Sequence, residues 1–149
     1  MSWIKFKYSP VVDPAASGGF LLDSDGKMVK RPILWIELTE NIGKTKIKVP
    51  GIIDSGADTT TVNIQYADIL GIELDKKNPR QIRGIGEGTV TKYQGVFPFA
   101  IKELDIKLEV PAWFVDSKNV DVLLGRQVFF DVFKIKFEQA QDVFELNQI

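Results

Sequence analysis

Alternating apolar and charged positions dominate this chain. The alternation has a period of two, as expected for β-strands that bury one face, and it is clearest in residues 45–49, 106–110 and 133–137. Residues 3–8 and 33–39 are further predicted strands. Two short runs, Ile52-Ile53 and Val122-Leu123-Leu124, have no polar face, which suits strands buried on both sides.

Helical signals are few and short. Asn63 can cap a helix over residues 64–70, and Gly71 stands where a left-handed stop residue would be needed. A second short helix could begin at Gly125-Arg126 and continue toward Phe130. The sequence therefore predicts an all-β fold of closed-barrel or sandwich character, with one or two short helices.

The N-terminal part is less regular than the rest. Residues 9–31 contain two prolines, a run of small residues at 15–19 and a turn signal at 23–26. The 149 residues fit a single domain. We expect an N-terminal arm or hairpin in residues 1–31, followed by one compact domain in residues 32–149.

The composition excludes several kinds of chemistry. The chain has no cysteine and no histidine, which removes cysteine nucleophiles, the usual Ser-His arrangements, disulfides and nearly all zinc, copper and iron sites. An acid and a base would therefore be carboxylates. The formal net charge of −1 gives no reason to expect nucleic acid or an anionic membrane as a partner.

The expected location is cytoplasmic. No stretch approaches the roughly 20 apolar residues that a membrane-spanning helix needs. The N-terminal residues have no uninterrupted apolar run before Pro10, so they make a poor signal peptide.

The sharpest local feature is the segment around Asp54. The apolar pair Ile52-Ile53 runs directly into Asp54, a hydroxyl at Ser55 and a glycine at Gly56. A carboxylate at the mouth of a buried strand is partly desolvated, as catalytic carboxylates often are. Taken alone, however, the tripeptide is equally typical of an ordinary turn.

Three segments together resemble the retropepsins, the retroviral-type aspartic proteases. The run from Asp54 to Asp58, Asp-Ser-Gly-Ala-Asp, resembles their active-site motif. The glycine-rich stretch 83–88 is similar to the tip of their flap, and Leu123-Leu124-Gly125-Arg126 is similar to the element before their C-terminal helix. The likeness covers residues 31–149 and implies an acid-protease fold with one lobe per chain.

This resemblance implies a role for each matching residue. Asp54 would be the catalytic carboxylate, and Arg126 would pair with Asp58, although from the residues alone Arg126 could equally be a solvated charge at a helix start. The expected support of the active site is Ser55, Gly56, Ala57, Asp58 and Arg126. The expected flap, which would close over the substrate, is Gly84, Ile85, Gly86, Glu87 and Gly88.

The chain holds a single Asp-Ser-Gly, so a mechanism with two aspartates needs two chains related by a two-fold axis. Two carboxylates close together share one proton, and such a pair can activate a water molecule. The resulting hypothesis is a homodimeric aspartic endopeptidase that acts on extended peptide or protein substrates. It implies no cofactor, no metal, no nucleic acid and no membrane partner.

Other readings stay open to different degrees. A non-catalytic dimerisation or peptide-binding module of the same fold is the main alternative. A carboxylate-based sugar hydrolase needs two acids in one site, and no second acid has a comparably structured context. A phosphate-binding loop at residues 84–88 is disfavoured, because a β-type run follows it rather than a helix. The N-terminal segment could pack beside the dimer, cover the cleft or be removed in maturation.

Overall fold

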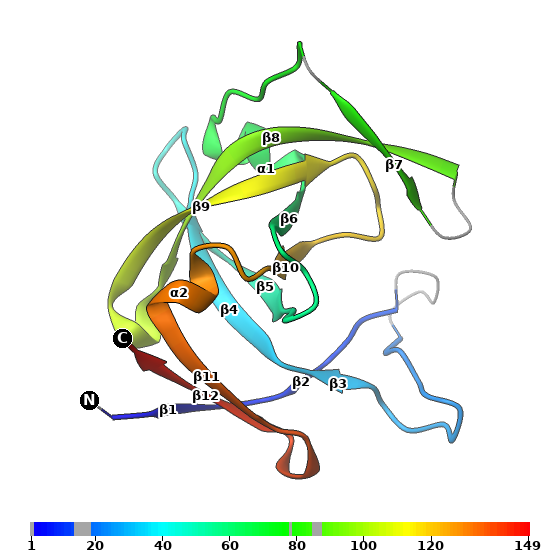
Figure 1. The fold of residues 1–149 in the computed structure, drawn as a ribbon, viewed down its shortest axis with the longest axis vertical. Coiled ribbons are helices and arrows are strands. Elements are labelled where there is room, and N and C mark those ends of the chain that lie inside the picture. The colour runs from blue at the N-terminus through cyan, green and yellow to red at the C-terminus, as the bar shows by residue number, and fades with distance from the viewer. Residues whose placement is uncertain (1, 14–18, 78, 85–87) are drawn as a thin grey trace.

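A computed structural model describes residues 2–13, 19–77, 79–84 and 88–149 (Figure 1). Within these residues, no helix is long and apolar enough to cross a membrane. The two short α-helices are α1 (Gln65–Leu70) and α2 (Phe129–Val132). The strands are β1 (Ile4–Lys7), β2 (Ser9–Pro10), β3 (Lys30–Arg31), β4 (Ile33–Thr39), β5 (Lys46–Ile53), β6 (Thr60–Asn63), β7 (Arg80–Gly84), β8 (Gly88–Ile101), β9 (Ile106–Val115), β10 (Val122–Leu124), β11 (Phe133–Glu138) and β12 (Val143–Gln148).

The largest sheet closes into a barrel. Its strands follow the order β4, β5, β10, β6, β9 and β8, and β8 pairs back onto β4 through Ala100 and Glu37. β7 continues the sheet beyond β8 as the other half of a hairpin that projects from the barrel (Figure 1). The predicted all-β fold with a closed barrel and few short helices is therefore confirmed.

Side chains fill the inside of the barrel. β4 shows the reason, because Leu34, Ile36 and Leu38 alternate with the exposed Trp35 and Thr39, as a strand with one buried face requires. The fully buried side chains from neighbouring strands include Val62, Phe97, Ile101, Val110, Phe114 and Leu124. Burial of these side chains is the main favourable contribution to folding.

The predicted strand segments are present, with two changes in extent. Residues 46–49 and 52–53 belong to one strand, β5, in spite of Pro50. Pro50 is tolerated because β10 pairs only with residues 51–53, so β5 has a single neighbour, β4, at the proline. Residues 106–110 are the first half of the longer β9.

The start predicted for the second helix was wrong. α2 begins at Phe129, because the backbone of Val128, with a φ of 68°, lies outside the right-handed helical region and breaks the helix before it. The first predicted helix, α1, ends at Gly71 with a φ of 68°, in the left-handed region. Asn63 Oδ1 accepts a hydrogen bond from the Gln65 N–H at 3.0 Å, near the helix start.

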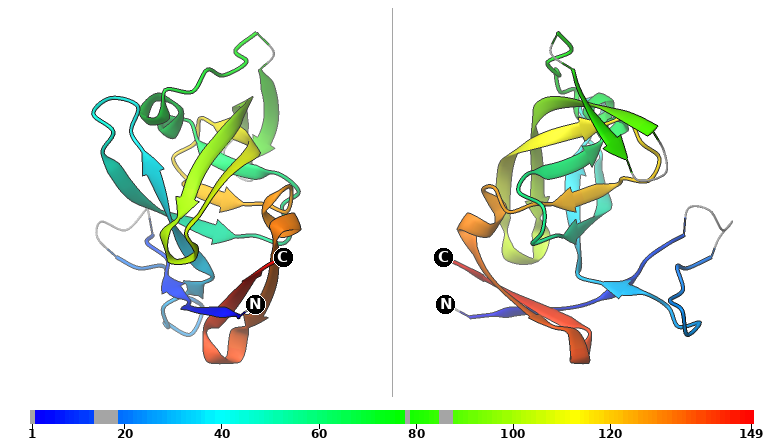
Figure 2. Two further views of the ribbon diagram at one scale, coloured as in Figure 1. Left: turned by 90° about the vertical axis from the view of Figure 1, so that its left-hand side faces the viewer. Right: turned by 45° about the vertical axis from the view of Figure 1, so that its right-hand side comes forward.

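A second, three-stranded sheet lies beside the barrel and joins the two ends of the chain (Figure 2). β12 pairs with β11 on one side and with β1 on the other. The Phe6 ring stacks on Phe144, with 5.1 Å between centroids. The first strand is thus integrated into this sheet, whereas residues 9–13 and 19–31, here termed the arm, project away from the barrel.

One polar contact ties α1 to the end of the loop before β10. The buried Tyr66 hydroxyl donates to the Asp121 carboxylate. Burial raises the pKa of Tyr66 well above its usual value, and the hydrogen bond and negative charge of Asp121 raise it further.

We predict that Tyr66→Phe lowers the free energy of unfolding by about 1 kcal/mol at neutral pH, through the lost hydrogen bond. Because the folded-state pKa is raised, the stabilisation by Tyr66 is complete below about pH 10 and is lost as the pH rises above that value. Urea unfolding at pH 7 and pH 10.5 measures both effects, with Tyr93→Phe as the matched control. Equal behaviour of the two variants would contradict this account.

Candidate active site

Asp54 lies immediately after β5, at the place where the chain leaves the barrel wall. β5 and β10 run parallel, with Ile53 beside Leu124, and the Asp54 N–H donates to the Leu124 carbonyl at 2.9 Å. The chain then crosses the end of β10 as the loop 54–59 and re-enters the sheet as β6, on the other side of β10. The loop is therefore fastened at both ends to the same short strand.

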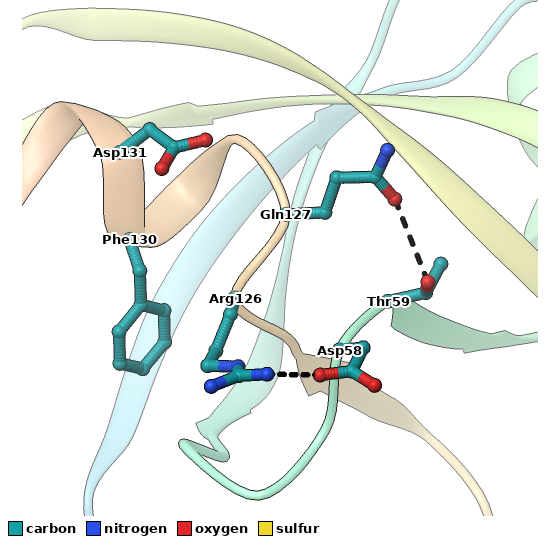
Figure 3. Close-up of a pocket in the computed structure, with 6 residues that line it drawn as sticks. All are labelled: Asp58, Thr59, Arg126, Gln127, Phe130 and Asp131. Atoms are coloured by element: carbon teal, nitrogen blue, oxygen red, sulfur yellow. Dashed lines mark hydrogen bonds and ion pairs between the residues drawn. The ribbon is translucent and has the colours of Figure 1, made fainter.

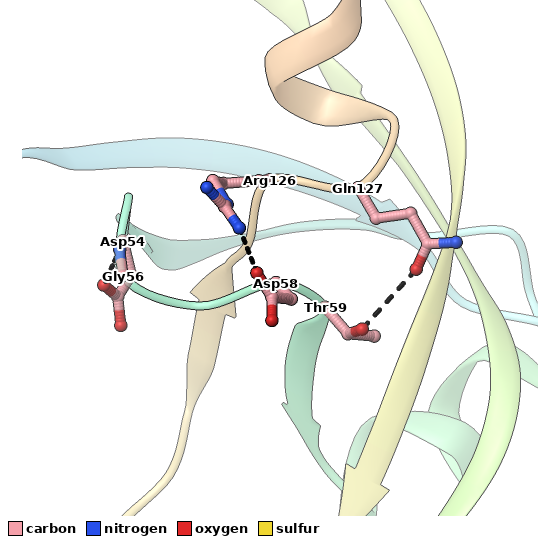
Figure 4. Close-up of polar contacts among 6 residues, drawn as sticks. All are labelled: Asp54, Gly56, Asp58, Thr59, Arg126 and Gln127. Atoms are coloured by element: carbon pink, nitrogen blue, oxygen red, sulfur yellow. Dashed lines mark hydrogen bonds and ion pairs between the residues drawn. The ribbon is translucent and has the colours of Figure 1, made fainter.

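Backbone groups inside the loop orient the Asp54 carboxylate. The Gly56 N–H donates to Asp54 Oδ1 at 2.9 Å, and the Ala57 N–H donates to the Asp54 carbonyl at 3.2 Å (Figure 4). A Cβ at Gly56 would lie 3.3 Å from Asp54 Oδ1, so glycine leaves the carboxylate its room. Asp54 is half-buried, and among the described residues no group donates to its Oδ2. One oxygen is thus fixed and the other is available.

At Gly125, the chain after β10 packs closely against the end of the loop that leads into β6. Its N–H donates to the buried Thr60 hydroxyl at 3.0 Å. A Cβ at Gly125 would come within 2.5 Å of the Thr59 carbonyl carbon and 2.8 Å of the Thr60 nitrogen, which no side chain could accommodate without moving the backbone. The turn after β10 can approach the loop this closely only with glycine at this position.

Two polar pairs continue the contact beyond Gly125. Arg126 forms an ion pair with Asp58, and the Thr59 hydroxyl donates to Gln127 Oε1 at 3.5 Å (Figure 4). Both members of the ion pair are exposed, so solvent screening leaves it little weight in overall stability. Its effect is local, because it fixes the direction of the Asp58 side chain.

An open pocket lies between the loop and α2. It is lined by Asp58, Thr59, Arg126, Gln127, Phe130 and Asp131 (Figure 3). Sequence reasoning identified Asp58 and Arg126 and missed the other four. Thr59 and Gln127 directly follow Asp58 and Arg126, so the signal that could have found them was adjacency to residues already singled out.

Val128 turns the chain sharply between this pocket and α2. Its φ of 68° and ψ of −53° lie in a region that β-branched residues rarely adopt. The Phe129 N–H donates to the Gln127 carbonyl at 2.9 Å, which closes a γ-turn, and Asp131 Oδ2 accepts from the Val128 N–H at 3.2 Å. Because of this turn, α2 can begin at Phe129 while the backbone N–H groups of Arg126 and Gln127 remain hydrogen-bonded to the loop 54–59.

The structure brings together Asp54, Gly56, Ala57, Asp58 and Arg126 among the predicted site residues. Ser55 is exposed beside Asp54, and its hydroxyl has no hydrogen-bond partner in the described part of the chain. Gly84 and Gly88 pair with each other at the end of the β7–β8 hairpin. Ile85, Gly86 and Glu87 lie outside the described residues.

Comparison with known proteins agrees with the fold. The sequence model of the aspartyl protease family matches residues 38–128, more than half of the chain. The chain therefore belongs to the aspartyl protease family. No curated protein matches.

Two solved structures are similar to this chain. One is a retropepsin-like aspartic protease from Rickettsia conorii, at 13% sequence identity and a TM-score of 0.57, with 98% of this chain and 99% of that chain covered. The other is the retroviral protease-like domain of Ddi1 from Leishmania major, at 14% identity and a TM-score of 0.48, covering 79% of this chain and 94% of that one.

We predict that Thr60→Val lowers the free energy of unfolding by about 1–3 kcal/mol, because the buried Gly125 N–H would lose its acceptor. Thr61→Val is the matched control, since it makes the same change at the next, half-buried position of β6. Thr60→Ser keeps the hydroxyl and should retain most of the stability. Chemical denaturation measures all three, and equal stability of Thr60→Val and Thr61→Val would refute the role of this hydrogen bond.

Proposed function

We propose that the chain is one subunit of a homodimeric aspartic endopeptidase, in which two Asp54 residues, one from each chain, activate a water molecule. The observation that carries the proposal is the Asp54 carboxylate, held by the Gly56 N–H at the end of a buried strand with one oxygen free. The sequence contains no second Asp-Ser-Gly or Asp-Thr-Gly. Membership of the aspartyl protease family supports the reaction class.

The proposed chemistry needs one proton shared between the two carboxylates. Two like charges a few ångström apart disfavour double ionisation, so one carboxyl keeps its proton. The ionised carboxylate takes a proton from water, and the resulting nucleophile attacks the peptide carbonyl carbon. The protonated carboxyl donates to the carbonyl oxygen as it gains negative charge. Breakdown of the tetrahedral intermediate returns a proton to the leaving amine.

The residues around Asp54 would position the pair and the substrate. Ser55, whose hydroxyl is exposed next to Asp54, would hydrogen-bond across the dimer axis. Gly56 and Asp58 would contact the peptide backbone, with Arg126 holding Asp58 in place. The peptide would lie extended between the loop 54–59 and the β7–β8 hairpin, whose residues 84–88 would act as the flap. A cytoplasmic location and the lack of nucleic-acid or membrane partners stay predictions from composition.

Asp54→Asn should lower peptide cleavage by at least about 100- to 10,000-fold, the usual contribution of a general acid or base. Asp105→Asn is the matched control, because Asp105 is exposed and has a φ of 50°, which asparagine tolerates. A diverse peptide library assayed from pH 4 to pH 7 measures the loss, and wild-type activity should peak at mildly acidic pH. A folded, dimeric wild type that cleaves nothing would instead favour the peptide-binding module.

The shared site predicts a dominant effect of the inactive subunit. If subunits exchange freely, adding an equal amount of Asp54→Asn should lower wild-type activity to about half, because half of all dimers become mixed. Activity per subunit should also fall on dilution below the dimer dissociation constant. Activity that does not respond to the variant, in a preparation shown to exchange subunits, would rule out a site built from two chains.

A further inference from the structure

The arm presents a continuous apolar face to solvent. Val12 pairs with Phe20, and Leu22 pairs with Met28, in antiparallel bridges. Residues directly opposite each other in antiparallel strands point to the same face, and so do residues two apart, such as Phe20 and Leu22. The four side chains therefore share one face of the arm, which we term the apolar strip.

The exposure of the apolar strip is unusual. Val12 is 63% exposed, Leu22 55%, Phe20 49% and Met28 46%. Single exposed apolar residues are ordinary, but a contiguous group on one face marks an interaction surface.

Hydrogen bonds within the arm give it a regular local structure. The backbones of Val11, Leu21 and Val29 are joined by hydrogen bonds of 2.7–3.1 Å. At its turn, Asp23 Oδ1 accepts from the Asp25 and Lys27 N–H groups at 2.9 and 3.0 Å. A surface that is shaped in advance loses less conformational entropy on binding.

The arm leaves the barrel directly beside the candidate active site. Its last strand, β3, ends at Arg31, and the next carbonyl, that of Pro32, accepts a hydrogen bond from the Ile53 N–H at 2.9 Å. Ile53 is the residue before Asp54. Because neighbouring strands are about 4.8 Å apart, the base of the arm lies within roughly 10 Å of Asp54, and hence of any two-fold axis that pairs two Asp54 residues.

The arm and the β7–β8 hairpin also project from the barrel on the same side. Figure 1 shows both on the right, one below and one above the loop that joins β5 to β6, and the right-hand view of Figure 2 agrees. In the proposed dimer, the second chain would lie on that side, next to the loop that carries Asp54. The apolar strip begins only two residues, about 7 Å, beyond the β2–β3 pair. A 149-residue partner has a radius of gyration of about 15 Å and would reach it.

The chain ends, in contrast, are already paired within one subunit. β12 has β1 on one side and β11 on the other, so neither side of β12 is open to a strand from a second chain. A strand from a second chain could join this sheet only at its outer strands, β1 and β11. The apolar strip is an exposed apolar surface on the arm, whose base lies beside the site that would need the second chain.

We propose that the arm is a clasp for a second copy of this chain, with the apolar strip packed against the partner subunit. The clasp rests on the dimer of the proposed function. It assigns residues 9–13 and 19–31 to the dimer interface, and it makes the strength of that interface depend on Val12, Phe20, Leu22 and Met28.

The test compares Leu22→Asp and Phe20→Asp with Ser24→Asp, which adds the same charge at an exposed turn position of the arm, outside the strip. Sedimentation equilibrium gives the dimer dissociation constant, and circular dichroism checks folding. Both strip variants should raise the dissociation constant at least about tenfold, since they remove a buried apolar side chain and bury a charge. Ser24→Asp should stay within about threefold of wild type, and the kcat of strip variants should recover at high protein concentration.

Three outcomes would overturn the clasp. The first is an unchanged dissociation constant in both strip variants. The second is an unchanged dissociation constant with a raised KM, which would place the substrate peptide on the strip. The third is a wild type that stays monomeric at every concentration. Failure of the proposed function is distinguishable, because a dimer weakened by the strip substitutions but without peptidase activity would support the clasp and reject only the endopeptidase.

Discussion

The site depends on one topological constraint, the insertion of β10 between β5 and β6. Two strands that are consecutive in sequence are kept apart by a third, so the loop between them must cross the end of β10. That crossing places Asp54 against Leu124 and Thr60 against Gly125. Backbone hydrogen bonds hold both ends of the loop, and the Thr60 hydroxyl adds a long-range side-chain contact to Gly125.

The same constraint explains why some polar groups at the site stabilise the fold and others orient side chains. The buried hydrogen bond between Thr60 and Gly125 stabilises the crossing, because an unpaired donor there would be costly. The exposed ion pair of Asp58 and Arg126 adds little stability and instead orients groups at the edge of the cleft. The γ-turn at Val128 holds a sparsely populated backbone conformation where the loop contact ends and α2 begins.

Much of the fold could be predicted from the sequence. Period-two alternation found the segments of β4, β5, β9 and β11, because each has one face on the core and one in solvent. The alternation did not show that β5 runs through Pro50. Whether a strand can contain a proline depends on which neighbouring strands pair with it at that position. The late start of α2 was also hidden, because the positive φ of Val128, which breaks the helix, is a conformation that a β-branched residue rarely adopts.

The candidate site was found through resemblance more than through pattern. Spacing alone cannot bring Asp58 to Arg126, and the motif around Asp54 is equally compatible with a simple turn. Thr60 was missed because a buried hydroxyl between two strands leaves no mark in the alternation of apolar and polar residues. The apolar strip of the arm was missed because the bridges that align its members join irregular segments.

The central claim is that two chains share one active site. Calorimetric titration of the wild type with a statine-containing peptide, a mimic of the tetrahedral intermediate, tests it most directly. The account predicts one inhibitor bound per two chains, and no binding of this kind to Asp54→Asn. One inhibitor per chain, or equal affinity for the Asp54→Asn variant, would contradict it.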